Sequence, residues 1–275
     1  MKDHPQETPQ AEMTLGEHLE ELRRRILYAL LGLGMAMAVS LLFTDHLLAF
    51  LRQPFDAAVA EIRQAYPGAP PPVLTTDRPT GGFTMYLRVA LFSGLVLSSP
   101  WICYQMWLFI AAGLLWKEKR YVTLSVPFSA ALFLAGVAFC WWAVAYPAMA
   151  FLLHFNAAKA HVVSFIQLDQ HILFLLRLML AFGIAFQTPL AIALLAKVGL
   201  VSMDKLRRYR RHVIVGILLL AAVLTPPDIF TQIMLAVPMY LLYELGVVLA
   251  WVWVFRKQTA QAGHREPRRE TPARN

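Results

Sequence analysis

The chain has 275 residues, of which 58% are hydrophobic and only 15% carry a charge. Soluble globular domains carry about 25% charged residues, so this composition excludes an ordinary soluble domain and indicates a protein that crosses a membrane several times. The net charge of +8 would favour a nucleic-acid partner in a soluble protein, but here the basic residues cluster at the ends of apolar segments, which indicates membrane topology and no nucleic acid.

Six apolar segments are candidates for membrane-spanning helices. A helix needs about 20 residues to cross the roughly 30 Å hydrocarbon core of a bilayer. The candidates are 26–43, 83–110, 121–153, 172–198, 213–225 and 229–255. The fifth reaches only about 20 Å before the sequence TPPD ends it, so it requires a locally thinned bilayer or shielding by protein. The sequence therefore predicts an all-α protein with six transmembrane helices and a short fifth helix.

The distribution of Lys and Arg predicts the orientation. Counted over the two terminal segments and alternate loops, nineteen of these residues lie on one side of the six predicted helices and four on the other. Cytoplasmic loops carry the excess of Lys and Arg, so we expect both termini in the cytoplasm.

The segments outside the spans differ in character. We expect 1–13 to be a flexible cytoplasmic N-terminus, 14–255 to be the transmembrane domain, and 256–275 to be a disordered basic tail, because the tail is polar and charged. The first outer loop, 44–82, contains the proline-rich string YPGAPPP, which favours a packed cap over a free linker. Cys103 and Cys140 lie in apolar runs and are predicted to be core residues without a disulfide or metal.

The stretch TLGEHLEELRRRILYALL begins the first helix. Thr14 and Glu17 have the spacing of a capping box, which places the helix start at Thr14. Acidic and basic residues then follow at the favourable i,i+4 spacing, pairing Glu20 with Arg24 and Glu21 with Arg25. The residues alone favour an interfacial helix whose arginines fix topology. An export signal is disfavoured because the apolar run continues and five more spans follow.

Four strings carry a resemblance to a known family. HLEELRRR resembles the N-terminal motif of the TatC family, the polytopic subunit of the twin-arginine protein translocase. In the same order along about 240 residues follow SSPWICYQMWLFIAAGLLWKEKR, FGIAFQTPLAI and LTPPDIFTQIMLAVPMYLLYELG. These resemble the end of the family's second helix with the loop after it, the fourth helix, and the turn between the last two helices.

The resemblance implies a receptor in the bacterial inner membrane. Such a protein binds twin-arginine signal peptides of folded precursors at its cytoplasmic face, with the apolar part of the signal in a concave groove. It works in several copies with single-span TatA- and TatB-type partners in the lipid bilayer, uses the proton motive force, and is neither an enzyme nor dependent on a cofactor. In this chain we find no P-loop, nucleophile-and-base motif or metal-ligand spacing.

By resemblance, the signal-binding positions are Glu21, Arg23, Phe109 and Glu118. Chemistry supports the two glutamates, because carboxylates bind guanidinium groups through bidentate hydrogen bonds. Alternatives remain open: core packing for Phe109, and for Glu118 local ion pairs with Lys117, Lys119 or Arg120.

Polar residues near or within the spans form a second set of candidates, since they are costly in a membrane unless they face protein or water. They are Gln187, Asp228, Gln232 and Glu244. Gln187 replaces the glutamate usual in the family, which leaves hydrogen bonding but removes ionisation. Asp228 has a competing role as a helix N-cap.

Two further predictions concern single residues and their surroundings. Glu244 is predicted to pair with Arg88 or Arg177, unless Arg177 extends its charged end to the membrane interface. Pro54 matches a family position in the outer loop, where the alternative is a simple loop stop.

The rival function is a secondary transporter of small solutes. It would need charged or unwound sites near the middle of the membrane in corresponding halves of the chain. The acidic candidates here lie mainly at the membrane edges, which favours the receptor.

Overall fold

The computed structural model describes residues 15–67, 72–75, 79–113, 116–155, 165–199, 201–225 and 228–262. In chain order the elements are α1 (Leu15–Leu42), α2 (Thr44–Ala65), β1 (Val73–Thr75), α3 (Gly81–Ala112), α4 (Trp116–Phe139), the π-helical turn η1 (Cys140–Ala145), α5 (Tyr146–Phe155), β2 (Phe165–Gln167), α6 (Leu168–Ala185), α7 (Thr188–Val198), α8 (Met203–Arg208), α9 (Arg210–Leu224) and α10 (Ile229–Ala262). The all-α prediction is confirmed. The two short strands pair in parallel, Val73 opposite Phe165.

Five helical runs among the described residues are long and apolar enough to cross a membrane: Gly16–Leu42, Gly81–Ala112, Ser125–Phe155, Leu168–Val198 and Ile229–Val252. They correspond to five of the predicted spans, so the chain is a multi-pass membrane protein. α9 matches the predicted short fifth span and has 15 residues, or about 22 Å of helix. That α9 also crosses the membrane stays a prediction.

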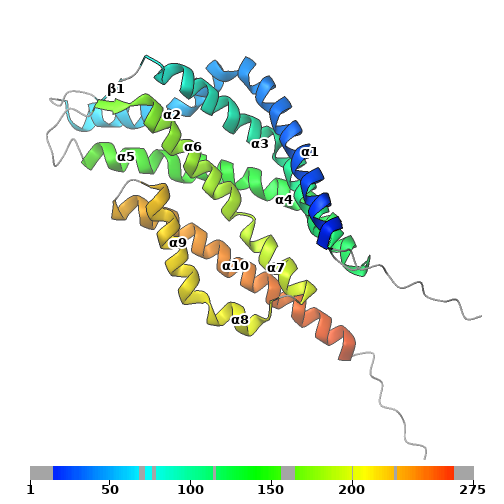
Figure 1. Ribbon diagram of the computed structural model, residues 1–275. Coiled ribbons are helices and arrows are strands. Elements are labelled where there is room, and N and C mark those ends of the chain that lie inside the picture. Colours follow the sequence, from blue (N-terminus) through cyan, green and yellow to red (C-terminus); the bar gives the residue numbers. More distant parts are fainter. Residues whose placement is uncertain are drawn as a thin grey trace, which may run out of the picture.

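The helices form an elongated bundle with α6 near its middle, α1 and α3 on one side of it and α9 and α10 on the other (Figure 1). The largest core cluster is built around α6, with Leu175, Leu178 and Phe182 almost fully buried. The start of α1, the end of α3, α8 and the end of α10 gather at one end, which we call the basic end (Figure 1). α2 and the strands lie at the opposite, capped end.

Prolines explain where two predicted spans depart from a regular helix. Pro147 lacks the N–H that would bond to the carbonyl of Ala143, and the chain forms the π-helical turn η1 just before it. Pro189 likewise cannot bond to Ala185, and the fourth span divides there into α6 and α7, separated by Phe186 and Gln187. By contrast, α3 continues through Pro100 as one helix.

The predicted loop 44–82 is wrong over its first half, because Thr44–Ala65 is the helix α2. Apolar residues recur at helical spacing and are buried against α5: Phe55, Ala58, Val59 and Ile62. Pro54 is a buried residue inside this helix, not a loop stop. This amphipathic period was the signal for a helix, and the prolines later in the loop concealed it.

Polar contacts also fasten α2 to α5. The hydroxyl of Tyr146 donates a hydrogen bond to Glu61, and Nε2 of His154 lies 3.2 Å from the other carboxylate oxygen of Glu61. The Tyr146 bond, followed by the His154 bond, lowers the pKa of Glu61 below its ordinary value.

Two glycines permit close helix crossings. A Cβ on Gly94 of α3 would lie 2.7 Å from the backbone nitrogen of Met37 in α1. A Cβ on Gly136 of α4 would lie 2.5 Å from the backbone oxygen of Phe182 in α6. Both distances are shorter than real contacts, so any larger side chain would force the helices apart.

Candidate functional site

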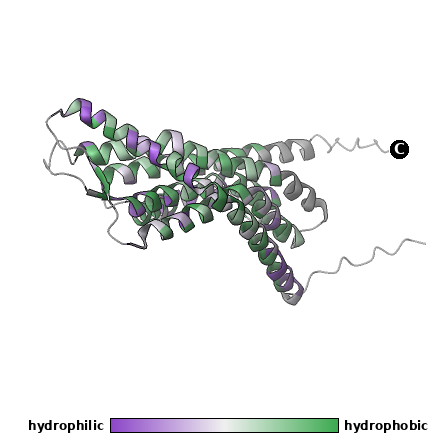
Figure 2. Ribbon diagram, turned by 90° about the horizontal axis from the view of Figure 1, so that it is seen from above, coloured by the Kyte–Doolittle hydropathy of each residue, from purple (hydrophilic) through white to green (hydrophobic). Residues whose placement is uncertain are grey.

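The first turns of α1 lie antiparallel to the last turns of α3 at the basic end. The rings of His18 and Phe109 stack with centroids 4.6 Å apart. Further along the pair, Nε1 of Trp101 donates to the carbonyl oxygen of Tyr28 at 2.9 Å. Figure 2 shows hydrophilic residues gathered near the N-terminal end of α1, while apolar residues cover most of the bundle. The candidate site is therefore a polar patch on an otherwise apolar helix pair.

Glu21 is the centre of this patch. Its side chain is only 12% exposed, and its two carboxylate oxygens bind different arginines. Oε1 accepts from Nε of Arg25 at 2.7 Å and lies 2.7 Å from Nη2 of the same group, whereas Oε2 accepts from Nη2 of Arg24. The predicted pair Glu21–Arg25 is confirmed. The predicted pair Glu20–Arg24 is wrong, because Arg24 turns to the less exposed carboxylate three residues earlier.

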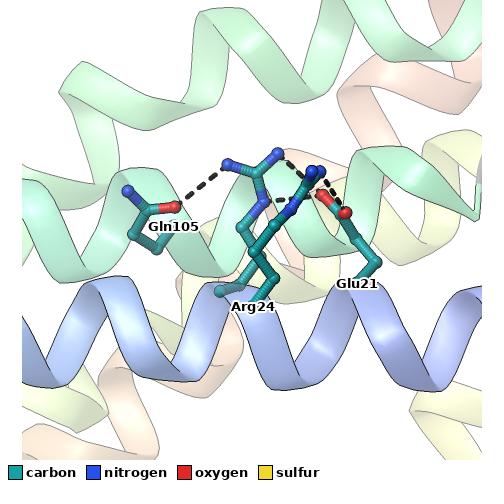
Figure 3. Close-up of polar contacts among 4 residues, drawn as sticks. Glu21, Arg24 and Gln105 are labelled. Atoms are coloured by element: carbon teal, nitrogen blue, oxygen red, sulfur yellow. Dashed lines mark hydrogen bonds and ion pairs between the residues drawn. The ribbon is translucent and has the colours of Figure 1, made fainter.

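Gln105 of α3 joins the same network and was missed in the sequence. It is 3% exposed, and its Oε1 accepts from Nη1 of Arg25 at 3.1 Å. Figure 3 shows the arginines lying between Glu21 and Gln105. The signal that could have identified Gln105 is a polar residue within an apolar span, one helical turn before Phe109.

The remaining signal-binding candidates are placed less completely. Arg23 is exposed and forms no ion pair with the described residues. Phe109 is half-buried and stacks on His18, so it belongs to the patch. Glu118 lies in the first turn of α4, but its side chain and the side chains of its three candidate basic neighbours fall outside the described part of the structure.

Gln187 lies at the break between α6 and α7 and is bonded at both ends of its amide. Its Oε1 accepts from the Ser129 hydroxyl at 2.7 Å, and its Nε2 donates to the Ser129 backbone oxygen at 2.8 Å. The side chain therefore ties the break to α4, which offsets the cost of an amide within the membrane.

Asp228 and Gln232 form hydrogen bonds at the N-terminal end of α10. Asp228 accepts from the backbone N–H of Thr231 at 2.7 Å, which confirms the N-cap, and from its hydroxyl at 2.5 Å. Gln232 donates to the backbone oxygen of Leu218 in α9 at 3.1 Å. This second bond joins the short helix to α10.

Glu244 has a different partner from those predicted. Its Oε2 lies 2.8 Å from Nη2 of Arg210, the first residue of α9, and its Oε1 accepts from the Tyr240 hydroxyl at 2.8 Å. Arg88 and Arg177 are both exposed and do not pair with it. Arg177 instead lines a cavity of about 390 Å³ between α6, α7, α9 and α10. The sequence could not reveal that α9 begins beside the middle of α10.

Comparison with known proteins decides the family. The family model described as Sec-independent protein translocase protein (TatC) matches residues 17–238. The chain belongs to the TatC family. Its role is therefore in Sec-independent protein translocation, and the solute-transporter alternative has no support in these matches.

Relatives from bacteria and a plant match nearly the whole chain. The TatC of Escherichia coli strain K12 is 34% identical over 237 residues, covering 86% of this chain and 88% of that protein. The TatC of Desulforapulum autotrophicum is 32% identical over 243 residues, covering 88% and 86%. The chloroplastic TATC of Arabidopsis thaliana is 36% identical, covering 89% and 67%.

Solved structures agree with the fold. A crystal structure described as the twin arginine translocase receptor TatC superposes with a TM-score of 0.75 at 30% identity, covering 86% of this chain and all of that one. A second structure of such a receptor, in DDM, also has a TM-score of 0.75, at 31% identity. The arrangement of α1 to α10 is thus the TatC fold.

Proposed function

We propose that this chain binds twin-arginine signal peptides at its basic end and is the receptor of a twin-arginine translocase. The observation that carries the proposal is the state of Glu21, whose two oxygens each bind a separate guanidinium group. A carboxylate that accommodates two neighbouring arginines of its own helix has the chemistry needed for two neighbouring arginines of a signal. Its low exposure strengthens the charge-assisted bonds relative to those of a freely solvated carboxylate.

Glu118, Phe109 and Arg23 complete the proposed site. The start of α4 follows directly on the end of α3, so Glu118 belongs to the same basic end as Glu21 (Figure 1). A second carboxylate there would share the two positive charges of the signal. Phe109 offers an aromatic face beside His18, and Arg23 is free to contact the signal backbone or orient the carboxylates.

The orientation belongs to this proposal as well. With nineteen Lys and Arg residues on one side and four on the other, the basic end faces the cytoplasm, where signal peptides are presented. We place both termini there and the chain in the bacterial inner membrane. The segment 1–13, which the sequence predicts to be a flexible N-terminus, falls outside the described residues, as do residues 263–275 of the predicted tail. Residues 256–262 of that tail continue α10.

TatA- and TatB-type single-span subunits are the proposed partners, in complexes holding several copies of the chain. α9 supports this part: within it only Ala221 is buried, whereas apolar side chains such as Val215, Leu219 and Val223 are more than half exposed. A single-span helix along α9 would cover this surface. The proton motive force would drive export, and the Gln187 amide would serve as a polar contact because it cannot ionise.

Binding of a synthetic twin-arginine signal peptide to the purified protein tests the proposal. We expect Glu21→Gln and Glu118→Gln each to weaken binding about tenfold, the effect of losing a hydrogen bond to a charged group. Glu20→Gln is the matched control, since it neutralises a neighbouring exposed carboxylate that binds no described arginine. Wild-type affinity in both site variants would sink the proposal.

A further inference from the structure

The guanidinium group of Arg25 occupies a position between two acceptors on different helices. On one side, Nε and Nη2 both lie 2.7 Å from Oε1 of Glu21. On the other side, Nη1 donates to Oε1 of Gln105 at 3.1 Å. The dashed contacts in Figure 3 follow this bridge from α1 to α3. We call the two acceptors the Glu21–Gln105 site.

This geometry suits a guanidinium better than an ammonium group. A guanidinium is a planar fork whose donors diverge, so one group reaches a carboxylate and an amide oxygen together. A lysine ammonium is a compact, strongly hydrated point charge without this planar fork, so it matches the two acceptors on different helices less well. Since the Gln105 amide is buried, leaving its oxygen without a donor is costly. Gln105 therefore supplies a reason for arginine selectivity that Glu21 alone lacks.

The site is already filled when no signal is present. Arg25 binds Oε1 of Glu21 and Arg24 binds Oε2. Two consecutive arginines of the chain therefore occupy the carboxylate that we propose binds two consecutive arginines of a signal. An added guanidinium would meet two positive charges around one negative charge. Arg24 and Arg25 are 58% and 20% exposed, so both side chains have a route to water.

We propose that Glu21 and Gln105 form one guanidinium-binding site, that Arg25 fills it in the signal-free chain, and that an arginine of the signal displaces Arg25. The inference rests on the proposed function and adds to it a selectivity residue and an internal competitor. Its consequence is that the affinity for a signal peptide is lower than it would be if Arg25 did not occupy the site. A signal with only one arginine would compete with Arg24 and Arg25 for Glu21 less favourably than a signal with two arginines.

The two residues of the bridge should shift affinity in opposite directions. Arg25→Gln removes the competitor and should tighten binding of a twin-arginine peptide about fivefold, the contribution of a partly exposed ion pair. Gln105→Leu keeps a similar volume but removes the acceptor, so it should weaken binding about fivefold and reduce the preference for an Arg-Arg over a Lys-Lys peptide. A purely structural bridge would weaken binding in both variants or in neither.

The experiment compares these variants with wild type in lipid nanodiscs, using both peptides. Arg207→Gln on α8 is the control for a general loss of positive charge, because Arg207 is an exposed cation at the same end. Unchanged or weaker binding by Arg25→Gln would overturn the inference even if Gln105→Leu fails to fold. If Glu21→Gln and Glu118→Gln both bind normally, the proposed function fails as well. If Glu21→Gln weakens binding while Arg25→Gln changes nothing, the inference is refuted and the proposed function stands.

Discussion

Two apolar helical runs of this chain, α1 and the α6–α7 pair, differ in how much of their surface the protein itself covers. In the apolar 18-residue stretch of Leu168–Val198, 50% of the residues are buried, whereas in that of Gly16–Leu42 only 6% are. Their hydropathies, 2.0 and 1.8, are nearly the same. Hydropathy therefore identifies a membrane helix without telling whether its neighbour is protein or lipid.

The difference also separates two uses of polar groups. In the central run, Gln187 bonds to Ser129 and holds a helix break to α4. In the peripheral helix, Glu21 binds two arginines whose side chains remain partly exposed. We therefore expect Gln187 to serve stability and Glu21 to bind a ligand.

The largest expected effect comes from filling the central crossing. Gly136→Leu places a side chain against the Phe182 backbone of α6, and such overpacking should destabilise the protein by about 3 kcal/mol. Gly34→Leu is the matched control on α1, because a Cβ there meets nothing within 4 Å. Thermal unfolding in detergent measures both. An equal loss of stability in the two variants would contradict the difference between central and peripheral helices.

A smaller effect is expected from the central amide. Gln187→Leu removes both hydrogen bonds to Ser129 and should cost about 1 kcal/mol, since hydrogen bonds between membrane helices contribute about 0.6 kcal/mol on average. The same unfolding measurement checks it, while binding of a twin-arginine peptide should change little. Gln187→Glu is the comparison variant for both measurements. A large loss of peptide binding in Gln187→Leu with normal stability would contradict this prediction and assign Gln187 to signal binding.

The smallest effect concerns the capped end and depends on pH. Because the folded-state pKa of Glu61 is lowered by Tyr146 and His154, its stabilising contribution is present above the ordinary pKa of about 4.3 and is lost as pH falls through the lowered value. Unfolding midpoints of wild type and Glu61→Gln should therefore differ slightly at about pH 7 and converge on strong acidification. If the difference between the two unfolding midpoints grew as pH falls, it would contradict the predicted direction.

Two local patterns were predictable because their partners lie on one helix. The capping role of Asp228 and the Glu21–Arg25 pair both follow from spacings of three and four residues. The predicted Glu20–Arg24 pair is wrong because sequence spacing does not show exposure. Glu20 is exposed, while Glu21 is mostly buried beside α3. Two equally spaced acids are distinguished only by the neighbouring helix.

Long-range partners were not predictable. Glu244 pairs with Arg210 because α9 begins beside the middle of α10, and Gln105 meets Arg25 across 80 positions of sequence. α2 was missed for another reason, since its amphipathic period was present but the proline-rich stretch after it favoured a loop. For the partners of Glu244 and Gln105, the deciding fact is which surfaces meet.

By itself the sequence determined that the chain is a multi-pass helical membrane protein of the TatC family, because apolar length, charge asymmetry and ordered motifs are all properties of the chain in order. Only the tertiary structure decided which helix is central, that Pro54 lies within a helix, and which acceptors surround Arg25. The physical reason is that lipid and protein interior are equally apolar, so hydrophobicity cannot choose between them. Packing shape and hydrogen bonds between helices make that choice.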